Sequence, residues 1–211
     1  VDAWLSNARI PPTFKDEPFY KTSLLFLKHA QNPTLGTIVA SFHPEYEFKV
    51  WMRDALYAAM ILDAAGYTIE ARMFYTWAAN NALADGNHYH TCYNYWTGED
   101  IGFVEPQLDS AGQYLLALLY HVSLASIKAG EMGDDSILDE AVAFVKSSKV
   151  VQRMKIISDY FINTKGTYNL APADYSIWEE SSSPVDGKAL STGYFSYTQG
   201  LSWAGLYSAY R

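Results

Sequence analysis

Two adjacent glutamates, Glu179 and Glu180, directly follow Trp178 in the stretch YSIWEE. Glycosidic hydrolysis needs one carboxylic acid to protonate the leaving oxygen and a second carboxylate on the far side of the sugar. Neighbouring side chains diverge from one backbone point, so this pair cannot fill both roles. Burial against Trp178 and the adjacent charge would raise one carboxyl pKa, as a proton donor requires. The other glutamate would accept a hydroxyl hydrogen; a solvated acidic loop is the alternative.

A second candidate cluster is VWMRD, residues 50–54, at the start of an expected helix. Arg53 beside Asp54 offers hydrogen-bond donors and acceptors that suit sugar hydroxyls, and Trp51 offers a flat ring. The simpler interpretation of this cluster alone is a helix-capping Asp54 with a surface ion pair.

The segment GFVEPQLDSAG, residues 102–112, places Glu105, Gln107 and Asp109 just before a helix. Asp109 is predicted to cap that helix through its side chain. Phe103 is either a wall of a pocket or a core residue.

His88, His90 and Cys92 alternate along one segment, so in extended backbone they would share a face. No second Cys/His cluster is present to complete a zinc centre, and we expect no metal. The sequence has no glycine-rich phosphate motif and no nucleophile elbow, so we also expect no cofactor.

Composition excludes several classes of protein. The 211 residues carry a formal net charge of −8 and a pI near 5.0, which argues against binding nucleic acid or an anionic membrane. No apolar run is long enough to span a bilayer. The single Cys92 permits no intrachain disulfide. With 17 Tyr and 6 Trp, the chain has many rings for a core or for stacking on sugars.

Hydrophobic periodicity predicts an all-α chain. A short extended piece is expected at 36–41, and long polar and aromatic loops at 86–107 and 164–193. Helical barrels are built from such helix pairs, with the loops at one end forming a pocket. The predicted helices span residues 18–31, 54–65, 68–84, 109–129, 136–147, 149–163 and 194–210.

Several segments together resemble glycoside hydrolase family 15, the glucoamylase family. They carry its W-x-R-D signature, its P-Q-x-D-x-x-G segment and its W-E-E acid segment, in the same order. The resemblance covers nearly the whole chain. The matching stretches are VDAWLSNA at the start, residues 36–61, residues 105–118, YSIWEE and residues 195–206.

The resemblance implies an (α/α)6 barrel that releases β-D-glucose, with inversion, from the non-reducing ends of starch-type α-glucans. Glu179 matches the general acid, and Glu180 matches a carboxylate that contacts substrate. Ile177 and Trp178 flank the acid as they do in the family.

In the other matching segment, Arg53 and Asp54 correspond to the residues that hold the terminal glucose, with Trp51 as a ring near them. Glu47 stands where fungal members have a tyrosine, and Phe103 where they have a tryptophan. These departures leave open a hydrolase of isomalto-oligosaccharides, dextran or trehalose. A non-catalytic glucan-sensing module of the same fold is a further alternative, because residues 1–211 lack the family's catalytic base.

By the same resemblance, residues 1–211 form one domain that covers only the first half of the barrel and is incomplete at the C-terminus. The catalytic base is therefore expected beyond Arg211, and the chain alone is expected to be catalytically incomplete. Its open edge should be apolar and should pack against the second half of the barrel. Secretion is the usual state in the family.

Overall fold

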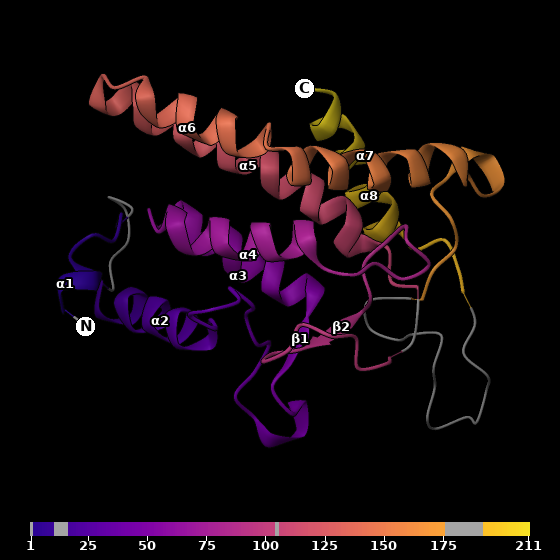
Figure 1. The fold of residues 1–211 in the computed structure, drawn as a ribbon, viewed down its shortest axis with the longest axis horizontal. Coiled ribbons are helices and arrows are strands. Elements are labelled where there is room, and N and C mark those ends of the chain that lie inside the picture. Colours follow the sequence, from indigo (N-terminus) through magenta and orange to yellow (C-terminus); the bar gives the residue numbers. More distant parts are fainter. Residues whose placement is uncertain (1, 11–16, 104–105, 176–191) are drawn as a thin grey trace.

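A computed structural model describes residues 2–10, 17–103, 106–175 and 192–211, and these residues are mostly helical (Figure 1). The prediction of a helical chain is confirmed. The α-helices are α1 (Asp2–Leu5), α2 (Glu17–Ala30), α3 (Met52–Ala64), α4 (Thr68–Asn80), α5 (Asp109–Met132), α6 (Ser136–Val145), α7 (Ser148–Asn163) and α8 (Ser196–Tyr210). Two 3₁₀ turns, η1 (Pro44–Tyr46) and η2 (Thr167–Asn169), lie in the connections.

Two short strands in the described residues were missed by the sequence reasoning. The strand β1 (Lys49–Trp51) pairs antiparallel with β2 (Cys92–Asn94), so that Trp51 lies opposite Cys92. The extended piece expected at 36–41 forms no regular strand and contributes an isolated bridge between Ile38 and Gln31. Three-residue strands carry too little pattern of their own, and it is the pairing across about 40 residues that defines them.

The start of α3 differs from the prediction in a way that matters for the candidate site. The helix begins at Met52, two residues before Asp54, and continues directly from β1. No side chain caps the start of α3. Instead the Met52 amide donates to the carbonyl of Thr91, the residue before β2, at 3.1 Å. Asp54 therefore lies inside the first turn, where its charge suits the helix dipole.

The helices α3, α5 and α8 pack on one another, with α5 in the middle. Gly112 on α5 and Gly205 on α8 let these two helices touch along their backbones, since a Cβ added to either glycine would overlap the backbone of the other helix. Helix α4 packs against α3, and α6 returns along α5 (Figure 1).

Much of the aromatic content is core. The rings of Tyr75, Tyr89, Tyr93 and Tyr114 are fully buried among the alanines and leucines of α3, α4 and α5. Three of their hydroxyls donate to backbone carbonyls, for example Tyr93 to Ala82 at 3.0 Å, which offsets the cost of burying a polar group. None of the described helices is long and apolar enough to cross a bilayer.

Candidate functional site

Arg53, in the first turn of α3, is held by two residues from the segment that leads into α5. Its Nε donates to Asp109 Oδ2 at 2.5 Å, and its Nη2 donates to Gln107 Oε1 at 2.7 Å. The Asp109 side chain is 1% exposed and that of Arg53 17%. Burial disfavours the charged guanidinium, but Asp109 more than offsets this and raises the pKa of Arg53. The arginine is thus fixed in place and charged.

This ion pair corrects two sequence predictions. Asp109 does not cap α5 with its side chain; Leu108 is the N-cap residue, and Asp109 turns its carboxylate to Arg53 instead. The acid next to Arg53 in the sequence, Asp54, is not the partner in this pair. The sequence analysis treated residues 50–54 and 102–112 as two separate candidate sites. In the structure they form one cluster through Arg53, Gln107 and Asp109.

Asp54 presents an exposed side chain beside this cluster. Even so, the surrounding protein displaces enough water to raise the pKa of its carboxyl group, with Arg53 opposing the rise and Asp109 adding to it. Asp54 thus adds an exposed carboxylate directly after the fixed guanidinium in the chain.

Trp51 and Phe103 also come together. Their ring centroids lie 4.6 Å apart at 72°, an edge-to-face contact. The indole Nε1 of Trp51 and the amide Nε2 of Gln107 are buried and have no hydrogen-bond partner among the described residues. A hollow of about 10 Å³, large enough for one water or one hydroxyl, is lined by Trp51, Arg53, Thr91, Gln107 and Asp109 with Met52 and Ser110.

Ile177, Trp178, Glu179 and Glu180 lie outside the described residues, and their predicted roles stay predictions. The two described ends of that segment are, however, fixed. Asp174 and Gly193 exchange backbone hydrogen bonds of 3.0 and 2.8 Å, and the Tyr175 amide donates to the Pro106 carbonyl at 2.9 Å. The described residues on both sides of 176–191 therefore lie next to Pro106, which directly precedes Gln107.

Asp174 is a buried carboxyl group that the sequence reasoning missed. Its Oδ2 accepts the Leu108 amide at 2.9 Å and the Thr198 hydroxyl at 3.0 Å, so it ties together the segments before α5 and at the start of α8. Complete burial raises its pKa to about 6, against the opposing effect of these two hydrogen bonds. The signal in the sequence is slight: one acid within the otherwise uncharged run Leu170–Tyr175.

A tyrosine pair, also missed, lies one turn beyond Arg53. The hydroxyl oxygens of Tyr57 on α3 and Tyr197 on α8 are 2.7 Å apart. Burial and the bond to Tyr57 raise the pKa of Tyr197, and Asp109 adds to this while Arg53 opposes it. Tyr197 is thus part of the electrostatic surroundings of the Arg53 cluster.

The histidines near Cys92 do not gather as the metal hypothesis would require. His88 Nδ1 contacts the Tyr89 carbonyl at 3.1 Å, and His90 faces Asp100 at 3.5 Å. Within the part of the chain that the structure describes, no three His, Cys, Asp or Glu side chains are placed to hold a metal ion.

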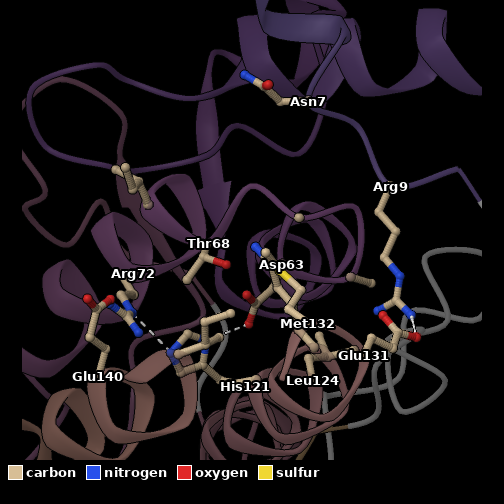
Figure 2. A pocket seen from close by; sticks show the side chains of 16 residues that line it. Asn7, Arg9, Asp63, Thr68, Arg72, His121, Leu124, Glu131, Met132 and Glu140 are labelled. Carbon is tan, nitrogen blue, oxygen red and sulfur yellow. Dashed lines mark hydrogen bonds and ion pairs between the residues drawn. The ribbon is translucent and has the colours of Figure 1, made fainter. Parts of the chain in front are cut away.

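A larger hollow of about 390 Å³ lies at the other end of the helices (Figure 2). Arg72 Nε donates to His121 Nε2 at 3.1 Å, so the His121 proton lies on Nδ1 and is donated to Asp63 at 2.7 Å. Asp63 stands ten residues after Arg53 on α3, about 15 Å along the helix. Arg72, His121 and Asp63 satisfy one another through these hydrogen bonds, and the hollow contains none of the predicted site residues.

Comparison with known proteins gives one distant relative. A protein of Methanocaldococcus jannaschii, described as an uncharacterized glycosyl hydrolase, is 26% identical over 177 residues. The match covers 83% of this chain but 23% of the relative, so the chain spans about a quarter of the relative's length. No family model and no solved structure matches the chain. The relative's name gives a reaction class and no substrate.

Proposed function

We propose that the protein is a glycoside hydrolase of the inverting, exo-acting α-glucosidase type, which releases β-D-glucose from the non-reducing ends of starch-type α-glucans. The observation that carries the proposal is the ion pair between Arg53 and Asp109. It unites two of the segments that separately resemble glycoside hydrolase family 15. The distant relative described as a glycosyl hydrolase supports the reaction class.

The proposed roles follow the chemistry of each group. Glu179 protonates the glycosidic oxygen as its bond to the anomeric carbon breaks. A water molecule, deprotonated by a carboxylate beyond Arg211, attacks that carbon from the opposite face and inverts its configuration. Glu180, Arg53 and Asp54 hold sugar hydroxyls.

The apolar walls of this site would be Trp51 and Phe103, with Trp178 and Ile177 beside the acid. Asp109 and Gln107 keep the guanidinium of Arg53 in one orientation, so it need not be ordered when the sugar arrives. Asp174, Tyr175 and Gly193, which flank residues 176–191, are bonded to one another and to Pro106, and this supports Glu179 acting on a sugar held by Arg53.

We further propose that the chain forms part of an (α/α)6 barrel whose second half is its packing partner. Helices α3 and α8 expose large apolar side chains, including Ile61 at 47%, Trp203 at 70% and Tyr207 at 49%. Trp203 and Tyr207 stack on each other with centroids 5.9 Å apart. The greater length of the relative leaves room for such a second half. Secretion remains part of the proposal through the resemblance alone.

The substitution Glu179→Gln in the intact protein tests the function. It keeps the shape of the side chain and removes the proton, so we expect turnover of maltoheptaose to fall by at least about 100-fold while binding survives. Proton NMR of the released glucose gives the anomer, and β-glucose is expected first. Glu140→Gln, a change of an exposed acid on α6, is the matched control. Undiminished turnover in Glu179→Gln would exclude this residue as the acid.

Two observations keep the linkage specificity open. Phe103, which contacts Trp51, has no indole donor, and the carboxylate of Glu47 is 70% exposed and paired with Lys49 rather than buried beneath a sugar. Rates on maltose, isomaltose and trehalose separate a glucoamylase-type enzyme from a hydrolase of the other linkages. Binding of these sugars without turnover in the intact protein would support the glucan-sensing module.

A further inference from the structure

Two large aromatic rings remain exposed at the ends of the two strands, where Phe48 precedes β1 and Trp96 follows β2. Phe48 is 41% exposed and Trp96 58%, and their centroids lie 5.3 Å apart with the planes at 52°. Tyr95 supports Trp96 edge-on at 5.4 Å. We call Phe48 and Trp96 the ring platform. In Figure 1 the strands and the segment before β1 extend beyond the ends of the helices.

The backbone is strained at this platform. Glu47 and Phe48, which follow η1, have φ angles of +47° and +53°, in the left-handed region that costs side-chain-bearing residues free energy. A bulky aromatic residue is a rare occupant of this conformation. Strain of this kind persists where the surrounding structure enforces it, and it clusters at functional sites.

The backbone under Trp96 is fixed although its ring faces solvent. Asn94 Oδ1 accepts the amides of Trp96 at 2.9 Å and Thr97 at 3.0 Å, and the Gly98 amide donates to the Asn94 carbonyl at 2.8 Å. Such a turn fixes the direction in which the indole leaves the chain. A ring ordered in advance loses little entropy when a ligand binds to it.

The platform also has polar groups of both signs beside it. The carboxylate of Glu47 lies 2.9 Å from the ammonium group of Lys49, and Lys49 faces Asn94 across the ladder. The Glu47 carboxylate is exposed and the Lys49 side chain is half-buried, and charged groups next to flat rings in the chain match a ligand with apolar faces and hydroxyl edges. A nucleic acid fits poorly, because the chain carries a net charge of −8.

We propose that Phe48 and Trp96 form a stacking surface for a saccharide chain, adjacent to the Arg53 cluster and distinct from it. Phe48 lies three positions before Trp51, about 10 Å in extended chain, so one oligosaccharide can reach both places. This inference rests on the proposed function for the identity of the ligand. It adds a site that binds substrate without taking part in bond cleavage.

Calorimetric titration of the intact protein with maltoheptaose and with maltose tests the proposal, in a Glu179→Gln background that leaves the sugar uncleaved. We expect Phe48→Ala and Trp96→Ala each to raise the Kd for maltoheptaose roughly three- to tenfold, with Trp96→Phe between them and the parent. Maltose, too short to use both sites, should bind as before. Tyr168→Ala is the matched control, because Tyr168 is 88% exposed at a φ of +60° and belongs to η2, outside the two strands and their flanks.

A further variant separates binding from folding. Phe48→Gly relieves the left-handed strain, so we expect its Tm to equal or exceed that of the parent while its affinity for maltoheptaose falls. A lower Tm with unchanged affinity would make Phe48 a structural residue and overturn the proposal.

The remaining outcomes separate the two proposals. If the protein hydrolyses maltoheptaose and the platform variants bind it as tightly as the parent, the platform is wrong and the enzyme stands. If maltoheptaose shifts the Trp96 indole NMR signal but is never hydrolysed, the platform stands and the enzyme is wrong. If the parent binds no maltoheptaose, both are wrong; a protein partner or a second copy that protects Trp96 would then explain the rings.

Discussion

The charge on Asp109 matters more for this site than any single contact it makes. It is buried, it neutralises Arg53, and it affects the pKa values of Asp54, Asp174 and Tyr197. One carboxylate thus adds to the pKa rise that burial causes in three other acidic groups, which come from three different segments. Because low-dielectric surroundings strengthen such coupling, a change at Asp109 should affect them together.

Replacing Asp109 by Asn should leave Arg53 buried without its counter-ion. Breaking a buried ion pair on one side costs about 3–5 kcal/mol of unfolding free energy, and Asn retains part of this through a neutral hydrogen bond, so we expect a loss of roughly 2–4 kcal/mol. Urea denaturation measures it. Asp159→Asn, which breaks the exposed pair with Lys155 on α7, is the control and should cost less than about 0.5 kcal/mol. Equal losses in the two variants would contradict a buried, charged pair.

Asp174 should make stability depend on pH. Its folded pKa of about 6 lies above the ordinary value of an aspartate, so the folded state holds the proton more tightly than the unfolded state does. The stabilisation is therefore complete below about pH 4 and is lost as pH rises through 6, amounting to roughly 3 kcal/mol.

Asp174→Asn removes this titration while its carbonyl oxygen can still accept from Leu108 and Thr198. We expect the difference in unfolding free energy between the variant and the parent to change by roughly 2 kcal/mol between pH 4 and pH 7, in favour of the variant at pH 7. Urea titrations at several pH values measure it. A difference independent of pH would show that Asp174 is not a buried titrating acid.

Residue types were predicted from the sequence better than residue partners. The sequence indicated a site at Trp51, Arg53 and Phe103 because an indole, a guanidinium and a phenyl ring are groups that suit a sugar. The structure places the rings of Trp51 and Phe103 in contact. The partner of Arg53 was assigned to its neighbour Asp54 because spacing along the chain is all that a sequence offers. The true partner lies 56 residues away and depends on how α3 and α5 pack.

At the scale of elements, the longer helices were predictable, whereas the four-residue α1 and the two strands were not. Helices such as α5 repeat their apolar positions over several turns, and Gly133, at a φ of +64°, ends α5 in the left-handed conformation that favours glycine. The end of α4 was predicted four residues late, since nothing in the sequence marks Asn80 as the last helical residue. The strands β1 and β2 are defined by their pairing with each other, which a local sequence pattern does not show.

The closest backbone approach between α5 and α8 provides a prediction about packing. Gly112→Ala or Gly205→Ala forces these helices apart, and we expect a loss of about 2–4 kcal/mol in unfolding free energy. Gly130→Ala on α5 and Gly200→Ala on α8 are the controls: open space surrounds both, so they should be neutral or stabilise by up to about 1 kcal/mol. Thermal unfolding of the four variants measures this. Similar effects at all four positions would rule out the close approach.

For the whole molecule, the exposed rings of α8 predict how the chain behaves alone. We expect isolated 1–211 to bind the dye ANS and to self-associate, because Trp203 and Tyr207 present adjoining apolar surface. A double change of these two residues to serine should reduce both effects. Phe19→Ser on α2, which removes a ring that is 65% exposed, should reduce neither. ANS fluorescence and light scattering measure this; a monomer that binds no ANS would contradict an unpartnered face.

The paired backbones of Asp174 and Gly193 have a consequence for how such a protein can change over time. A stretch whose two ends are fastened to each other can gain or lose residues without pulling on the helices on either side. The entropic cost of a longer loop grows only with the logarithm of its length, about 0.6 kcal/mol for each doubling. Insertions between these two residues should therefore be tolerated while Arg53 keeps its place.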